Sequence, residues 1–397
     1  MIYNIHFELA TAVMLFILVL VYFIRESLPI RRNRQFLKTL FFLIVDTILS
    51  ALQCYAGGFV GKIPDIYICV LNIFVYLTGI IFIVCYNSYV LSIFHYKKVI
   101  NFYSVINYGI FLAAAILIVT SPLTGWYFYT GSDGIIHSGM ARNIMNVLYM
   151  MTMFMTIAVA EMSGKKKDKK LYRMILVTDI IITMAAIADN INKNSVGITM
   201  IVANMCTFLL YFSMKSPDYY LDIRTGRFNL NGFMEVLREK IDYNESVSCF
   251  LIRVQNYHAI CRIYDEESLQ EVQRQIAEIL YYKAEDKNIY HIGAATFAVF
   301  VDSTEMAKKL YEKVVKVMPH QWNVKREALS HEYSYYYVTY PDDSDDAEDI
   351  IQRIHYARSD HKGHHKPNEL IHLRKEALEE ARRFKEVAHR IEEAILD

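Results

Sequence analysis

The sequence Asn288-Ile-Tyr-His-Ile-Gly-Ala-Ala-Thr-Phe-Ala-Val-Phe-Val301 contains two short apolar segments that meet at Gly293 and Ala294. Aromatic and β-branched residues are frequent in both segments, as they are in strands. Gly293 lets the backbone turn tightly between them. The pattern predicts a β-hairpin with an exposed tip, which carries methyl groups and a single hydroxyl group.

The regions around this hairpin show helix and strand patterns in alternation. Apolar side chains recur at helical spacing in residues 266–282, and residues 332–340 are rich in strand-forming tyrosines. Further helices are expected over residues 230–241, 304–317 and 347–356, and a further strand over residues 247–254. This order predicts an α+β, ferredoxin-like domain with a mainly antiparallel sheet and helices on one face.

A second motif lies upstream, Leu221-Asp-Ile-Arg-Thr-Gly-Arg-Phe-Asn-Leu-Asn-Gly-Phe233. It resembles the D-x-L-T-G-L-x-N-R-x-x-F motif at the start of GGDEF domains, and residues 291–300 resemble their R-x-G-G-D-E-F-A-V hairpin. The matching positions of the upstream motif are Asp222, Thr225, Gly226, Asn229 and Phe233, and the departures are Arg224, Arg227 and Leu230. Residues 216–372 are therefore identified as similar to a GGDEF domain.

Active GGDEF domains are diguanylate cyclases, which condense two GTP molecules into cyclic di-GMP and use carboxylates to hold two metal ions. The resemblance places two of these metal-ligand positions at Arg253 and Ala295, where a guanidinium and a methyl group stand instead. The family's guanine-reading positions correspond to Cys261 and Gln270. We therefore expect no catalytic residue, no metal site and no cofactor, and a protein that is not an enzyme. The degenerate hairpin comprises Gly293, Ala294, Ala295, Thr296 and Phe297.

Basic residues remain where the family contacts the triphosphate. Arg358 and Lys362 occupy these positions and indicate weak GTP binding without catalysis. The alternative is that both are solvated surface charges. Several histidines lie between residues 361 and 372, but Lys and Gly interleave with them, so a solvated loop is expected there and not a metal site.

The first half of the chain is strongly apolar. Hydrophobic residues make up 54 % of the whole sequence, which is high for a soluble protein. Several stretches approach the ~20 residues that a helix needs to cross the ~30 Å hydrocarbon core. These stretches are residues 7–24, 36–55, 66–94, 100–120, 143–160, 171–188 and 196–214. We expect a seven-helix, all-α transmembrane bundle over residues 1–214, with a sensor-like role.

The charges of the loops predict the orientation, because cytoplasmic loops carry an excess of Lys and Arg. Basic residues gather in alternate loops, in residues 25–34, 97–98 and 165–170. The N-terminus is then outside, and the domain from residue 215 onward is cytoplasmic. The predicted location is a bacterial inner membrane, crossed several times, with the lipid bilayer as a partner.

Two acidic residues lie near the middle of expected membrane helices, Asp46 and Asp179. A bare carboxylate is costly there, so both side chains must face the bundle interior, find a partner or carry a proton. One interpretation is an intramembrane sensor site for a ligand or a proton. The other is a hydrogen-bonded packing contact with Asn or Tyr.

Residues 373–397 lack Gly and Pro and favour a long helix. Apolar residues follow a heptad spacing, which is typical of a coiled coil and indicates a homodimer. Packing of this helix on the preceding domain is the alternative. The segment also resembles the helix that leads into EAL phosphodiesterase domains in tandem GGDEF–EAL proteins.

The sequence thus predicts a membrane-bound bacterial signalling protein of the cyclic di-GMP type, with an inactive, regulatory GGDEF domain and a cyclic di-GMP signalling partner. A truncated cyclic di-GMP phosphodiesterase lacking its EAL domain is one alternative. A membrane scaffold that binds GTP or a protein is another. Net charge is zero, and acidic residues exceed basic ones after residue 214, so nucleic acid is excluded as a partner.

Overall fold

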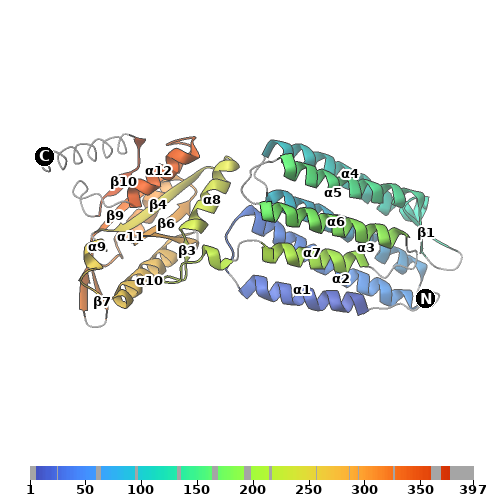
Figure 1. Cartoon of the computed structure of the whole chain (residues 1–397), viewed down its shortest axis with the longest axis horizontal. Helices are drawn as coiled ribbons and strands as arrows, with labels where there is room; N and C mark the ends of the chain where they lie inside the picture. Colours follow the sequence, from blue (N-terminus) through green and yellow to red (C-terminus); the bar gives the residue numbers. More distant parts are fainter. Residues whose placement is uncertain are drawn as a thin grey trace. The chain divides into compact units, whose positions relative to one another are not determined.

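The computed structural model describes residues 6–24, 26–59, 64–93, 97–131, 136–162, 169–191, 198–213, 217–255, 257–285, 287–293, 295–324, 327–358 and 368–375. The chain divides into two compact units, Met1–Ser216 and Pro217–Asp397. We call them the helical unit and the sheet unit, and each is described by itself (Figure 1). Residues 376–397, most of the expected C-terminal helix, lie outside the described residues, and so does Lys362, a predicted phosphate contact.

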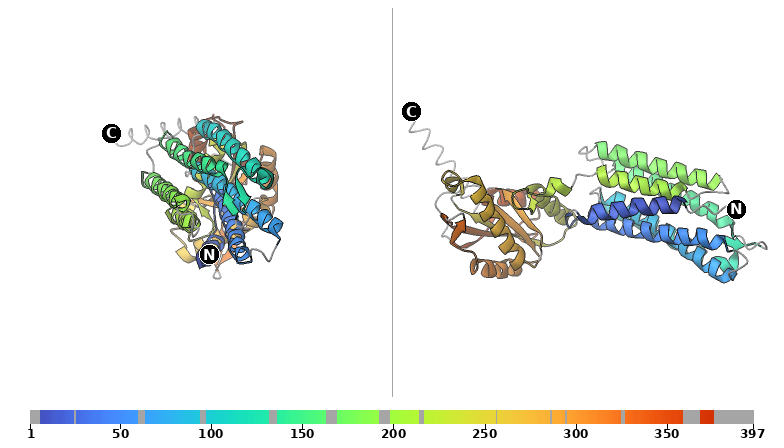
Figure 2. Two further views of the ribbon diagram at one scale, coloured as in Figure 1. Left: turned by 90° about the vertical axis from the view of Figure 1, so that its right-hand side faces the viewer. Right: turned by 90° about the horizontal axis from the view of Figure 1, so that it is seen from below.

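The helical unit is built from long helices that run alongside one another (Figures 1 and 2). Buried aromatic rings fill its interior, among them Tyr86 and Phe36. A short hairpin of β1 (Phe128–Thr130) and β2 (Ile136–Ser138) joins two of the helices. The helices are α1 (His6–Ile24), α2 (Arg31–Gly57), α3 (Asp65–Ser92), α4 (Lys97–Thr124), α5 (Met140–Met162), α6 (Lys169–Ile191) and α7 (Ile198–Ser213).

Three helices in the described part of the chain are long and apolar enough to cross a membrane. They are Arg31–Gly57, Asp65–Ser92 and the Phe102–Thr124 part of α4, and α1 adds a shorter apolar segment. The expected count of seven spans is therefore not supported. Helix α7 has only 16 residues, and α6 carries charged residues at both ends and in its middle, which lowers its apolar character.

The sheet unit contains a six-stranded sheet in the order β10-β9-β4-β6-β5-β3. The central strands pair antiparallel, whereas the edge strands β3 and β10 pair parallel with their neighbours. A separate two-stranded hairpin consists of β7 (Gln321–Val324) and β8 (Glu327–Ser330). The strands of the sheet are β3 (Phe228–Asn229), β4 (Val247–Val254), β5 (Ile289–Gly293), β6 (Thr296–Val301), β9 (Tyr333–Tyr340) and β10 (Leu370–His372).

Helices cover both faces of this sheet, so the expectation of helices on one face is wrong. Helices α10 (Glu266–Lys283) and α11 (Thr304–Val315) share an apolar core with alternate residues of β4, such as Phe250 and Ile252. On the opposite face, Phe233 of α8 (Leu230–Asp242) stacks on Phe300 of β6 with ring centroids 4.8 Å apart. Helix α12 (Ala347–Arg358) packs against β9 and β4. Because side chains alternate along each strand, apolar residues in a row bury both faces.

Side-chain caps start three of these helices where the sequence provides a short polar residue. The side chain of Asn229 accepts a hydrogen bond from the Gly232 amide at the start of α8. The side chains of Asp265 and Ser303 accept corresponding hydrogen bonds from backbone amides at the starts of α10 and α11. Such caps satisfy amides that have no partner within the helix.

Candidate functional site

The described residues on either side of the β5–β6 tip are half-buried or buried rather than exposed. Gly293 and Ala295 both have a left-handed backbone, with φ of +101° and +50°, and Ala294 lies outside the described residues. Ala295 is only 1 % exposed, and its carbonyl accepts a hydrogen bond from the amide of Val254 at 3.2 Å. The methyl group of Ala295 therefore fills the core, although this backbone conformation costs an alanine about 1–2 kcal/mol.

A row of polar residues crosses the sheet beside this tip. Arg253 on β4 pairs in register with Thr296 on β6 and with Ser334 on β9. The Arg253 side chain is buried at 6 % exposure. The neighbouring Gln255 donates a hydrogen bond from its amide to the Ser334 hydroxyl. Among the described residues, the Thr296 hydroxyl has no hydrogen-bond partner. This row therefore contains an unpaired hydroxyl group in register with the Arg253 guanidinium.

A second arginine lies over the hairpin tip. Arg358, at the end of α12, places Nη2 only 3.2 Å from where a Cβ on Gly293 would be. Its Nη1 is 3.1 Å from Nδ1 of His355, and burial lowers the pKa of the Arg358 guanidinium. A larger residue at position 293 would thus displace this group. The geometry brings the predicted phosphate-binding Arg358 to the hairpin.

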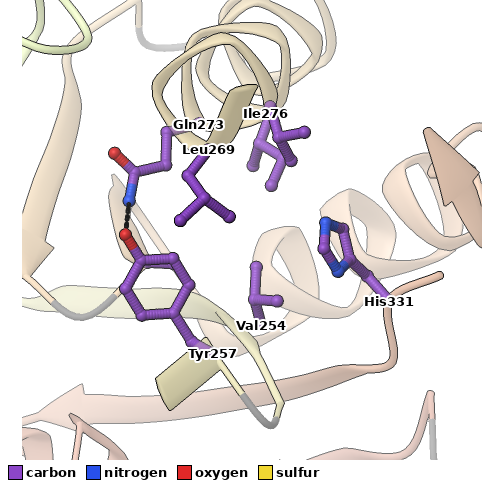
Figure 3. Close-up of a pocket in the computed structure, with 8 residues that line it drawn as sticks. Val254, Tyr257, Leu269, Gln273, Ile276 and His331 are labelled. Atoms are coloured by element: carbon purple, nitrogen blue, oxygen red, sulfur yellow. Dashed lines mark hydrogen bonds between the residues drawn. The ribbon is translucent and has the colours of Figure 1, made fainter. Parts of the chain in front are cut away.

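A small cavity lies behind the hairpin tip (Figure 3). Its volume is only about 10 Å³, roughly the space that one water molecule needs. The Gln273 side-chain amide donates to the Tyr257 hydroxyl at 2.7 Å, and His331 lies on the opposite side of the cavity (Figure 3). The lining residues are Val254, Tyr257, Leu269, Val272, Gln273, Ile276, Ala295 and His331.

His331 is a polar residue of this cavity that the sequence did not reveal. It is 3 % exposed. Burial lowers its pKa, although a backbone hydrogen bond at Ser330 acts the other way. A neutral imidazole is therefore favoured here. A single histidine ahead of a strand offers no sequence signal for this placement.

The two sequence motifs meet at Asp222 and His291. Oδ2 of Asp222 lies 3.1 Å from Nδ1 of His291. Oδ1 accepts hydrogen bonds from the amides of Arg224 and Thr225, both at 3.0 Å. Burial raises the pKa of Asp222, but His291 and Thr225 outweigh it and bring the pKa to about 2. The ionised carboxylate of Asp222 therefore connects the upstream motif to strand β5 of the hairpin through His291.

Two cationic side chains, Arg253 and Arg358, belong to the surroundings of the hairpin, and guanidinium groups suit phosphate geometry. Within the described ranges, no group of three or more His, Cys, Asp or Glu side chains is placed to hold a metal ion. Cys261 is exposed, and the Gln270 side chain donates to Glu266 at 3.2 Å.

The two predicted intramembrane acids each have a separate partner in the helical unit. Oδ1 of Asp46 accepts a hydrogen bond from the Thr78 hydroxyl at 2.8 Å. Oδ1 of Asp179 accepts one from the Tyr86 hydroxyl at 2.9 Å. Asp179 is completely buried, whereas Asp46 is half-buried. The two carboxylates therefore occupy different environments.

Solved structures that resemble this chain are GGDEF domains. The GGDEF domain of FimX from Pseudomonas aeruginosa shares 16 % identity, covers 38 % of this chain and 98 % of its own, and has a TM-score of 0.34. A diguanylate cyclase/phosphodiesterase from Caldicellulosiruptor saccharolyticus shares 17 %, covers 40 % and 96 %, and has a TM-score of 0.32. The diguanylate cyclase SiaD of P. aeruginosa, in complex with its activator SiaC, shares 18 %, covers 58 % and 88 %, and has a TM-score of 0.35.

No protein-family model and no curated protein sequence matches the chain. These solved structures include GGDEF domains, the family that the two sequence motifs resemble. The prediction that the chain is not an enzyme is contradicted by the same comparison, because the similar structures include diguanylate cyclases, which are enzymes. The residues at Arg253 and Ala295 do not by themselves show inactivity.

Proposed function

We propose that this chain is a membrane-bound signalling protein of the cyclic di-GMP type, whose sheet unit is a regulatory domain that binds a guanine nucleotide. The observation that carries this proposal is the 3.1 Å contact between Asp222 and His291. It joins the two motifs that resemble GGDEF domains into one structural element beside the hairpin. The apolar helices supply the membrane-bound part.

The nucleotide is proposed to bind through its phosphates at the hairpin tip. Arg358 lies against the backbone of Gly293, and Arg253 is buried in the adjacent row of the sheet. Charge-assisted hydrogen bonds between guanidinium and phosphate are about twice as strong as neutral ones. Lys362 is the further basic residue that the sequence assigns to these phosphates.

We further propose that the sheet unit is cytoplasmic, at a bacterial inner membrane, with the N-terminus outside. Clustered Lys and Arg in alternate loops support this orientation. The heptad spacing in residues 373–397 supports a homodimer or a helical signalling partner. Asp46 and Asp179 are the candidates for the signal-receiving site.

The test is a binding titration of the full chain in detergent with GTP and Mg²⁺, and separately with cyclic di-GMP. Arg358→Ala is expected to weaken GTP binding by roughly 10- to 150-fold, since one charge-assisted hydrogen bond contributes about 1.5–3 kcal/mol. Arg274→Ala is the matched control, because Arg274 is exposed on α10 and pairs with Glu271 and Glu278. It should leave binding unchanged.

Absence of binding by both nucleotides would refute the proposed function, and equal weakening by both variants would refute the assignment of Arg358. Chromatography of the same GTP samples measures cyclic di-GMP formation. Cyclic di-GMP above an enzyme-free blank would show that this chain synthesises it. Arg358 is then expected to be required for turnover as well.

A further inference from the structure

A fully buried carboxyl group lies in the apolar core of the helical unit. Asp179 on α6 is 0 % exposed. It shares a helix face with Ile175 and Ile182, one turn to either side, because residues three and four apart are neighbours on a helix. Both isoleucines belong to a core cluster that also contains Tyr86 of α3 and Cys206 of α7. The carboxyl group is therefore enclosed by apolar side chains.

The hydrogen bonds of this carboxyl group are incomplete. Oδ1 accepts from the Tyr86 hydroxyl at 2.9 Å. Oδ2 is buried and has no hydrogen-bond partner within the described part of the chain. Next to Tyr86 on the same helix, the side-chain oxygen of Asn87 is also buried without a partner among those residues. Carbonyl and carboxylate oxygens thus lack donors in this core.

Three described titratable groups interact with Asp179, and none of them carries a positive charge in either protonation state. Tyr86, Tyr103 of α4 and Cys206 are the described groups that interact with it electrostatically. Tyr103 uses its hydroxyl on Thr152 and Thr156 of α5, at 2.8 and 2.7 Å. None of these groups supplies a positive charge to compensate a carboxylate.

An ionised carboxylate in such a core is costly unless a positive charge accompanies it. One hydrogen bond from a tyrosine offsets only a small part of the cost of removing the charge from water. A divalent ion would leave an uncompensated positive charge in the same core. A single positive charge leaves the site neutral.

We propose that Asp179 and Tyr86 form a binding site for one monovalent positive charge, either a proton or an alkali-metal ion. The site goes beyond nucleotide binding, because it gives the chemistry of a signal that the helical unit receives. It connects α3 and α6, so occupancy changes the contact between these two helices. Its existence does not depend on whether the sheet unit binds GTP.

The experiment uses the full chain in detergent and follows thermal unfolding in two arms. In one arm pH is varied with choline as the only added monovalent cation. In the other arm pH is fixed, and sodium or potassium replaces choline at constant ionic strength. Ligand binding to the folded state is expected to raise the Tm of the wild type by on the order of 5 °C at saturation.

The Asp179→Asn variant is neutral and nearly the same shape, so it is expected to lose this response. Asp65→Asn is the control: Asp65 is an exposed acid in the first turn of α3, so its variant should respond like the wild type. A response in the pH arm alone identifies the proton, and a response to sodium or potassium identifies an alkali ion.

Equal responses of the wild type and Asp179→Asn in both arms, or no response of the wild type, would overturn the proposal. If Asp179→Asn does not fold, Tyr86→Phe decides instead. It keeps the ring but removes the hydrogen bond to Oδ1, so it should shift the pH or cation concentration of half-effect. An unshifted midpoint in Tyr86→Phe would count against the site.

Discussion

The contact between Asp222 and His291 is predicted to stabilise the sheet unit at neutral pH and to stop doing so in acid. The pKa of Asp222 is about 2 in the folded chain, against about 3.9 in an unfolded chain. The unfolded chain therefore takes up the proton more readily. The stabilisation is complete above about pH 4 and is lost as pH falls toward about 2.

The magnitude follows from the difference in pKa. A shift of this size corresponds to at most about 2.6 kcal/mol of free energy of unfolding. The Asp222 side chain is 21 % exposed, so solvent screening reduces the expected contribution to about 1–2 kcal/mol. Asp222→Asn keeps an oxygen that accepts from the amides of Arg224 and Thr225 but removes the charge.

Urea unfolding of a fragment covering residues 217–397 measures this contribution, with Trp322 fluorescence as the signal. Trp322 is the single tryptophan of this fragment; it is buried and donates to the Tyr333 hydroxyl at 2.6 Å. Asp222→Asn should lose about 1–2 kcal/mol at neutral pH, and the loss should shrink as the pH falls below 4. Asp345→Asn, in an exposed loop, is the control and should match the wild type. A loss for Asp222→Asn that stays constant from neutral pH to about pH 3 would refute the linkage argument.

Three further predictions concern other parts of the chain. Burial lowers the pKa of His331, so the unfolded chain binds its proton more readily. The free energy of unfolding should therefore fall as pH drops below about 6.5. The His331→Leu variant should lose this dependence in urea unfolding at several pH values. Arg353 is 2 % exposed and bonds to Asp349 and to the carbonyls of Asp343 and Leu373, so Arg353→Met should cost about 3–5 kcal/mol, and a loss below about 1 kcal/mol would contradict this. The exposed Cys261 should react with a membrane-impermeant maleimide in inverted vesicles but not in intact spheroplasts, and the opposite pattern would reverse the proposed orientation.

Long helices and strands of the sheet unit were predictable from the sequence, because the spacing of their apolar side chains indicates the type of element. Helix α10 was expected over 266–282 and spans Glu266–Lys283. Strand β4 was expected over 247–254 and spans Val247–Val254. In contrast, β3 and β10 have two and three residues, too few for any period to show. They exist because neighbouring strands offer free backbone groups for pairing.

The parts of the candidate site that depend on long-range packing were not predictable. The hairpin was expected, but its tip was expected to be exposed, and Ala295 is buried because Val254 and the cavity residues close over it. His331 reaches the same cavity from a distant loop. The expected seven spans are not supported, because only three helices among the described residues are long and apolar enough to cross a membrane.

The two parallel edge strands have a consequence for how force passes through the sheet unit. The chain comes from the helical unit through β3 at one edge of the sheet and leaves through β10 at the other. With neighbouring strands about 4.8 Å apart, these edges are separated by roughly 24 Å. A force applied between residues 217 and 373 therefore acts across the strands of the hydrogen-bonded sheet rather than along any one of them.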